Sequence, residues 1–161
     1  MRLVTIPNES TDVSECERIT PEILAEYLDD DVALVCVQIV NYRSGARQDV
    51  PALTATARDH GAYVLWDASH AVGSIDLRFD EWGVDIAVGC TYKYCNSGPG
   101  SPAWMFVRSD LHDTLRTPID GWFGQKDQFT MGPTFERASG MRGYQIASPS
   151  IVGLTAVDES M

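Results

Sequence analysis

The chain has 161 residues, 44% of them hydrophobic, and a net charge of −11, which is typical of a single globular domain with a modest core. Its ten arginines and two lysines do not gather into a basic stripe, which argues against nucleic-acid binding. No apolar run approaches the roughly 20 residues of a membrane span, and the first residues lack the apolar core of a signal peptide. We therefore expect a reduced, cytoplasmic protein with no membrane partner.

The four cysteines indicate neither a disulfide framework nor a metal site. Cys16, Cys36, Cys90 and Cys95 form no C-x-x-C pair and have no zinc-like spacing with histidine. We therefore predict that the protein holds no metal. Cys36 lies in an apolar run and is predicted to be a buried small hydrophobic residue.

The predicted elements begin with a helix that Thr20 caps, with Pro21 at its first position. A near-continuous apolar run over 32–40 predicts a strand that is covered on both faces. A second helix is predicted over 50–60, with Pro51 in its first turn and Gly61 just past its end.

Three further strands are predicted, over 62–66, 84–88 and 103–107, with a helical turn at 79–82. Strands that alternate with helices predict an α/β fold with a mostly parallel sheet and flanking helices. The step between the last two strands contains no long helix, so the last strand is predicted to run antiparallel.

The remainder of the chain is predicted to carry less regular structure. A helix capped by Ser109 is expected directly after the last strand. From 118 to 148 the chain is rich in glycine, proline and polar residues, which is typical of a long functional loop region.

Three residues with catalytic chemistry follow two of the predicted strands. Asp67 and His70 follow the strand 62–66, and Lys93 follows the strand 84–88. The carboxyl ends of parallel strands are where open α/β sheets bind ligands. A lysine, with a carboxylate that could face a pyridine nitrogen, is what a pyridoxal phosphate enzyme requires.

Each of these residues also has an ordinary structural interpretation. Asp67 alone fits a helix N-cap, His70 a hydrogen-bonded structural histidine, and Lys93 a surface lysine. A surface role explains poorly why Lys93 lies between two tyrosines and is followed by the turn N-S-G-P-G. Their combination therefore favours a functional site.

Three motifs in the chain carry a family resemblance: D-x-x-H-A-x-G from Asp67, G-C-x-Y-K-Y-x-N-x-G-P-G-x-P-A from Gly89, and G-W-F-G from Gly121. Together they resemble kynureninase, a family of fold type I pyridoxal phosphate enzymes related to class V aminotransferases. The D-x-x-H and lysine elements also occur in cysteine desulfurases, whereas the longer run around Lys93 and the G-W-F-G element are typical of kynureninase. The resemblance extends over about 32–156.

The resemblance implies specific roles at the cofactor. Lys93 would form the Schiff base with pyridoxal 5'-phosphate, and Asp67 would pair with the pyridinium nitrogen and keep it protonated. His70 would lie beside the ring. Tyr92 would reach the cofactor phosphate and assist proton transfer, so that Lys93 and Tyr92 are the predicted catalytic residues.

Three more residues are assigned to the cofactor with less support. By the resemblance, Trp122 would come from the neighbouring subunit of a homodimer and Ser148 would lie at the phosphate. Without it, Trp122 fits a packed loop aromatic equally well, and Ser148 a turn residue before Pro149. Gln38 stands at the end of the strand 32–40, where the family has a serine or threonine that contacts the cofactor, so its cofactor role rests on position alone.

The implied reaction is hydrolysis of L-kynurenine or 3-hydroxykynurenine to anthranilate or 3-hydroxyanthranilate and L-alanine, in tryptophan catabolism and NAD biosynthesis. Family members are much longer, so 1–161 are expected to be part of the cofactor-binding large domain, without the N-terminal phosphate-cup segment or the C-terminal small domain. A truncated, catalytically incompetent paralogue is one alternative. A cysteine desulfurase-like lyase is another, although that chemistry needs a catalytic cysteine on a downstream loop and none follows Cys95.

Overall fold

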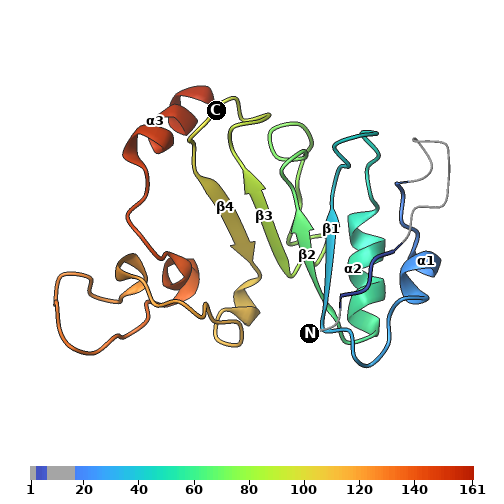
Figure 1. Ribbon diagram of the computed structural model, residues 1–161, viewed down its shortest axis with the longest axis horizontal. Coiled ribbons are helices and arrows are strands. Elements are labelled where there is room, and N and C mark those ends of the chain that lie inside the picture. The colour runs from blue at the N-terminus through green and yellow to red at the C-terminus, as the bar shows by residue number, and fades with distance from the viewer. Residues whose placement is uncertain (1–2, 7–16) are drawn as a thin grey trace.

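The computed structural model describes residues 3–6 and 17–161 (Figure 1). A four-stranded sheet in the order β1-β2-β3-β4 forms its centre. β1, β2 and β3 are parallel, and β4 is antiparallel to β3. This confirms the predicted α/β class, with a mostly parallel sheet and an antiparallel last strand. The strands are β1 (Leu34–Gln38), β2 (Tyr63–Asp67), β3 (Ile86–Cys90) and β4 (Ala103–Val107).

Two helices begin where their capping residues predict. Thr20 caps the short helix α1 (Pro21–Ala25) by accepting a hydrogen bond from the Ile23 backbone at 3.3 Å. The helix α2 (Val50–Asp59) has Asp49 as its N-cap and a proline in its first turn. Gly61 follows α2 with a φ of 81°, as expected for a residue just past a helix.

After β4 the chain forms only short helical turns before the last helix, α3 (Ile151–Ser160). The 3-10 turns are η1 (Ser109–Leu111), η2 (Trp122–Gly124) and η3 (Gly140–Tyr144). The predicted helix capped by Ser109 is wrong: Ser109 is the first residue of η1, and no side chain caps that turn. The turn buries only Leu111, which leaves no apolar stripe that could hold a longer helix against the core.

The main core lies between α2 and one face of the sheet. Trp66 of β2 is fully buried there, and its indole Nε1 donates a hydrogen bond to the Thr54 hydroxyl of α2 at 3.0 Å. Such a bond satisfies a polar group that burial would otherwise leave unpaired. The buried residues of this core include Leu24, Ile39, Val50, Leu53, Ala57, Val64, Val84 and Ala87.

The opposite face of the sheet is less well covered. Side chains alternate between the faces of a strand, and on β1 this places Leu34, Cys36 and Gln38 on the face away from the core. Leu34 is 46% exposed and Cys36 is also exposed. The predictions that this strand is covered on both faces and that Cys36 is buried are therefore wrong. An apolar run shows that both faces of a strand are hydrophobic, but it does not show whether other residues pack on them. Cys16 lies outside the described residues.

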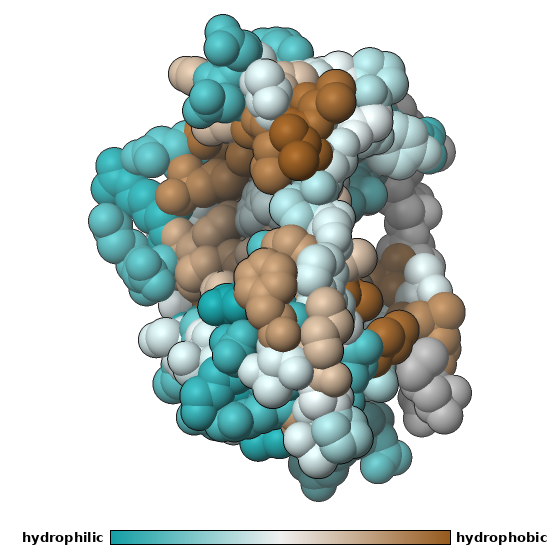
Figure 2. Space-filling model, turned by 90° about the vertical axis from the view of Figure 1, so that its left-hand side faces the viewer, coloured by the Kyte–Doolittle hydropathy of each residue, from teal (hydrophilic) through white to brown (hydrophobic). Residues whose placement is uncertain are grey.

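A second apolar surface surrounds α3. Gly153 is the buried residue of this helix, whereas Ile151, Val152 and Leu154 are exposed. Figure 2 faces the side of the molecule that carries α3 and shows brown apolar surface beside teal polar surface. None of the helices in 3–6 and 17–161 is long and apolar enough to cross a membrane.

Candidate active site

Asp67 is the last residue of β2, at the edge where β1, β2 and β3 end, which we call the carboxyl edge. Its Oδ1 accepts a hydrogen bond from the Ser69 backbone at 2.8 Å, so a tight turn orients the carboxylate. No helix begins at this turn, which removes the N-cap interpretation. Within the described part of the chain no cation pairs with Asp67, so its charge remains available to a ligand.

His70 lies in the middle of a row of three aromatic rings. Its ring centroid is 6.3 Å from that of Tyr42 and 6.4 Å from that of Tyr94. The three residues follow β1, β2 and β3, so the row crosses the carboxyl edge from strand to strand. Neither Tyr42 nor Tyr94 is among the site residues predicted from the sequence. The position of Tyr94 directly after Lys93 was the signal that could have identified it, whereas nothing in the sequence placed Tyr42 beside His70.

Lys93 is half-buried three residues beyond β3. Its Nζ lies 5.5 Å from the centroid of the Tyr92 ring, and no carboxylate among the described residues pairs with it. The only other lysine, Lys126, is bonded to Glu136 at 2.5 Å, and this hydrogen bond raises the pKa of Lys126 above its ordinary value. An amine held protonated in this way is a poor nucleophile, so Lys93 is the lysine suited to carbonyl chemistry.

Gly73 brings the turn of Asp67 and His70 against the turn of Lys93. Its φ is +79°, and a Cβ at this position would lie 2.7 Å from the carbonyl carbon of Tyr94 and 2.9 Å from the Cys95 nitrogen. Only glycine tolerates both this φ and this approach. The Cys90 thiol also lies 3.9 Å from the Ser69 carbonyl oxygen. The two turns therefore form one continuous surface.

Hydroxyl groups close the loop that follows Lys93. The Thr91 hydroxyl donates to the Pro102 carbonyl at 2.7 Å, and the Ser97 hydroxyl donates to the Thr91 carbonyl at 2.7 Å. Gly153 of α3 packs on this loop, because a Cβ there would lie 3.0 Å from the Pro102 ring. The exposed Ser148, shortly before α3, thus belongs to a segment that reaches the Lys93 side of the sheet.

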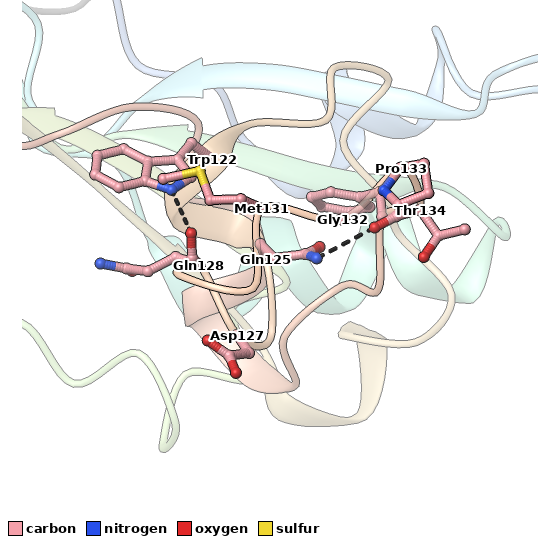
Figure 3. Close-up of a pocket in the computed structure, with 9 residues that line it drawn as sticks. Trp122, Gln125, Asp127, Gln128, Met131, Gly132, Pro133 and Thr134 are labelled. Carbon is pink, nitrogen blue, oxygen red and sulfur yellow. Dashed lines mark hydrogen bonds between the residues drawn. The ribbon is translucent and has the colours of Figure 1, made fainter.

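Trp122 belongs to a segment that lies away from the carboxyl edge. Figure 1 draws its segment in orange, at the end of the sheet away from the carboxyl edge, whereas α3 lies near that edge. In Figure 3 its indole Nε1 donates to the Gln128 carbonyl, at 2.6 Å, beside an open hollow of about 380 Å³ lined also by Met131 and Phe135. Within one chain the structure does not bring Trp122 to Asp67 and Lys93.

Gln38 ends β1 directly beside Asp67. The two residues are paired in the parallel register of β1 and β2, so their side chains lie on the same face of the sheet. The Gln38 Oε1 is buried without a hydrogen-bond partner among the described residues. In that part of the chain no group of three or more His, Cys, Asp or Glu residues could hold a metal ion.

Comparison with known sequences shows the family to which the chain belongs. Residues 9–136 match the model of the aminotransferase class-V family, and the chain belongs to that family, whose members use pyridoxal phosphate. It is 40% identical over 139 residues to the kynureninase of Pseudomonas fluorescens, and 38% identical over 138 residues to that of Burkholderia mallei strain SAVP1. Each match covers 86% of this chain and 33% of the relative, so the chain spans about a third of the length of these relatives.

Solved structures show the same fold. The apo cysteine desulfurase from Thermococcus onnurineus NA1 matches 94% of this chain and 36% of its own, with a TM-score of 0.75 and 18% identity. The alanine–glyoxylate aminotransferase from Nostoc sp. matches 89% of this chain and 37% of its own, with a TM-score of 0.65 and 22% identity. The chain therefore has the fold of the type I pyridoxal phosphate enzymes.

Proposed function

We propose that this chain is the cofactor-binding part of an enzyme that hydrolyses L-kynurenine or 3-hydroxykynurenine. The observation that carries the proposal is the packing of the Asp67–His70 turn on the Lys93 turn through Gly73. Among the described residues, an oriented carboxylate without a cation, a lysine without a carboxylate partner and a buried amide oxygen without a hydrogen bond lie on one edge and fit pyridoxal phosphate. The kynureninases at 38–40% identity support the choice of substrate within the family.

Each residue has a defined task in the proposed reaction. The cofactor supplies an electron sink conjugated to the substrate α-carbon. Asp67 would hold the ring nitrogen protonated, and His70 would flank the ring. Lys93 would hold the cofactor through its aldehyde, and its amine would move the substrate α-proton. Tyr92, whose ring centroid lies 5.5 Å from the Lys93 Nζ, would reach the phosphate and assist that transfer.

The overall reaction balances with water as the only co-substrate. Water adds to the aryl ketone, the bond between this carbon and Cβ breaks, and Cβ takes up a proton. The products are anthranilate, or its 3-hydroxy form, and L-alanine. No oxidant or metal is required.

The proposal includes a homodimer. The orange segment that contains Trp122 lies at the other end of the sheet from the turn that follows β3, so a second copy would have to supply Trp122 to the site (Figure 1). The exposed apolar residues of α3 fit such a partner, because apolar patches of this kind mark association surfaces (Figure 2).

Reductive trapping tests the cofactor assignment. The purified chain is incubated with pyridoxal phosphate, reduced with borohydride and mapped by mass spectrometry. We expect the pyridoxyl group on Lys93, so that Lys93→Ala loses the adduct. Lys126→Ala is the matched control, since it removes the only other lysine and should keep the adduct.

Two outcomes oppose the proposal at different levels. An adduct that survives in Lys93→Ala, or that is shared equally with Lys126, overturns the lysine assignment. An adduct on Lys93 without release of anthranilate from L-kynurenine favours the catalytically incompetent paralogue instead.

A further inference from the structure

Residues 122–136 form a projecting segment that carries Trp122, and we call this segment the arm (Figure 1). The arm is closed at its base, where an isolated β-bridge joins Gln125 to Arg137. Trp122 is fixed within the arm, because its indole Nε1 donates to the Gln128 carbonyl at 2.6 Å. The position of Trp122 relative to the sheet therefore depends on what holds the arm as a whole.

Two side chains attach this part of the molecule to the sheet. Between 121–161 and the rest of the described chain, every hydrogen bond comes from Arg137 or Tyr144. The Arg137 Nη1 donates to the His112 carbonyl at 3.3 Å, and the Tyr144 hydroxyl donates to the Leu115 carbonyl at 2.6 Å. Both carbonyls belong to the segment that follows β4. We call Arg137 and Tyr144 the clasp.

The clasp connects the end of β4 to the base of the arm. The Arg137 guanidinium carbon lies 4.3 Å from the centroid of the Tyr144 ring, which is a cation–π distance, and the Arg137 Nε donates to the Gly143 carbonyl at 3.1 Å. The His112 ring centroid is 6.0 Å from that of Tyr144. The His112 Nε2 donates to the Val107 carbonyl of β4 at 2.8 Å. Contact is thus continuous from the sheet to the arm.

The surroundings of Arg137 favour a positioning role over a purely stabilising one. Its Nη2 is buried without a hydrogen-bond partner, and no carboxylate among the described residues pairs with it. A partly buried cation without an anion destabilises a fold. The planar guanidinium nevertheless bonds the carbonyls of His112 and Gly143 at the same time, which fixes the orientation of two segments.

We propose that Arg137 and Tyr144 are positioning residues that act on the site of the partner subunit. Their role rests on the function proposed above, in which the arm of one copy carries Trp122 to the edge with Asp67 and Lys93 in the other. A rotation at the base of the arm displaces its far end most. Loss of the clasp should therefore move Trp122 away from the partner's site and leave the sheet of its own chain intact.

Hydrogen exchange of the cofactor-free chain tests whether the clasp holds the arm. Arg137→Met keeps the stem of the side chain and removes the guanidinium. We expect amide exchange in 122–138 to become about 10–100-fold faster, because hydrogen bonds from a charged donor are lost, and exchange in β2 and β3 to stay unchanged. Tyr144→Phe removes a single hydroxyl and should give a smaller increase in the same segment. Arg116→Met, at an exposed arginine, should change neither.

Hybrid dimers test the action on the partner. Co-expression of Arg137→Met with Lys93→Ala under two affinity tags isolates a dimer whose only Lys93 faces an arm with an intact clasp. Borohydride trapping over a range of pyridoxal phosphate concentrations measures the adduct on that lysine. We expect the Arg137→Met homodimer to bind about tenfold more weakly than the wild type, the upper size of one aromatic contact, and the hybrid to bind like the wild type. A hybrid with the double variant Lys93→Ala/Arg137→Met is the matched control and should stay weak.

The outcomes separate this role from the proposed function. If the wild-type chain takes up no cofactor, the proposed function and the action on the partner both fail. If the wild type loads and the hybrid stays as weak as the Arg137→Met homodimer, the clasp acts only within its own chain, and the proposed function stands. Unchanged exchange in 122–138 also overturns the role. Faster exchange throughout β2 and β3 in both Arg137→Met and Tyr144→Phe does so too, because the two residues would then serve the fold.

Discussion

Two aspartates at opposite edges of the sheet are used in opposite ways. Asp85, just before β3, has a side chain only 2% exposed and pairs with Arg108 at 2.9 Å and Arg58 at 3.3 Å. Its second oxygen accepts from the Val64 backbone at 3.1 Å. Asp67, at the end of β2, accepts one backbone hydrogen bond and has no cation among the described residues. A carboxylate whose partners are all protein groups contributes to stability, whereas one left partly unpaired is available to a ligand.

Substitution by asparagine at Asp85 and at Asp67 should give the largest difference in the free energy of unfolding. We expect Asp85→Asn to lower the free energy of unfolding by about 3 kcal/mol, because two arginines lose their shared anion. This is the low end for a broken buried ion pair, since Arg58 is 47% exposed and water can solvate it. Urea unfolding measures the loss. A value below about 1 kcal/mol would remove the stabilising role of Asp85.

The contact between the two turns at the carboxyl edge can be tested with two glycines of similar φ. Gly73 has a φ of +79° and Gly98 a φ of +78°, but only Gly73 would place a Cβ against another backbone. We expect Gly98→Ala to cost about 1 kcal/mol from backbone strain alone, and Gly73→Ala about 1–2 kcal/mol more through the clash. Urea unfolding of both variants checks this. Equal losses would show that the turns do not depend on this contact.

Asp67→Asn completes the comparison with a small effect on stability. We expect a change below about 0.5 kcal/mol, because the amide oxygen can still accept from Ser69. Pyridoxal phosphate should bind about 10–100-fold more weakly, as expected for one lost charge-assisted hydrogen bond. Fluorescence titration measures the affinity. Unchanged affinity would separate Asp67 from the cofactor.

The smallest expected effect is at the surface next to Asp85. The hydrogen bond from Arg108 lowers the pKa of Asp110 below its ordinary value. A depressed pKa in the folded state stabilises the fold above the unfolded pKa, and this contribution disappears as the pH falls through the folded pKa. Asp110→Asn should therefore be slightly less stable than the wild type at neutral pH and equal to it in strong acid. Acid unfolding followed by circular dichroism compares the two, and a difference that persists in strong acid would contradict this origin.

Local signals predicted most of the elements, because they depend on neighbouring residues. Thr20-Pro21 marked the start of α1, Pro51 and Gly61 bounded α2, and 103–107 coincides with β4. The prediction failed at Ser109, where the residues that follow lack an apolar stripe to pack. It also failed at Cys36, because local sequence does not say whether anything covers the second face of a sheet.

The residue types, the motif spacing and the family follow from the amino-acid sequence alone. Lys93, Asp67 and His70 were predicted to share an edge because parallel strands end on the same side of a sheet. The tertiary structure decided what depends on distant pairing: the aromatic row of Tyr42, His70 and Tyr94, and the place of Trp122 at the other end of the sheet. It also decided that Asp85 pairs with two arginines whereas, among the described residues, no arginine pairs with Asp67, because the register of the strands and the packing of α2 determine which groups meet.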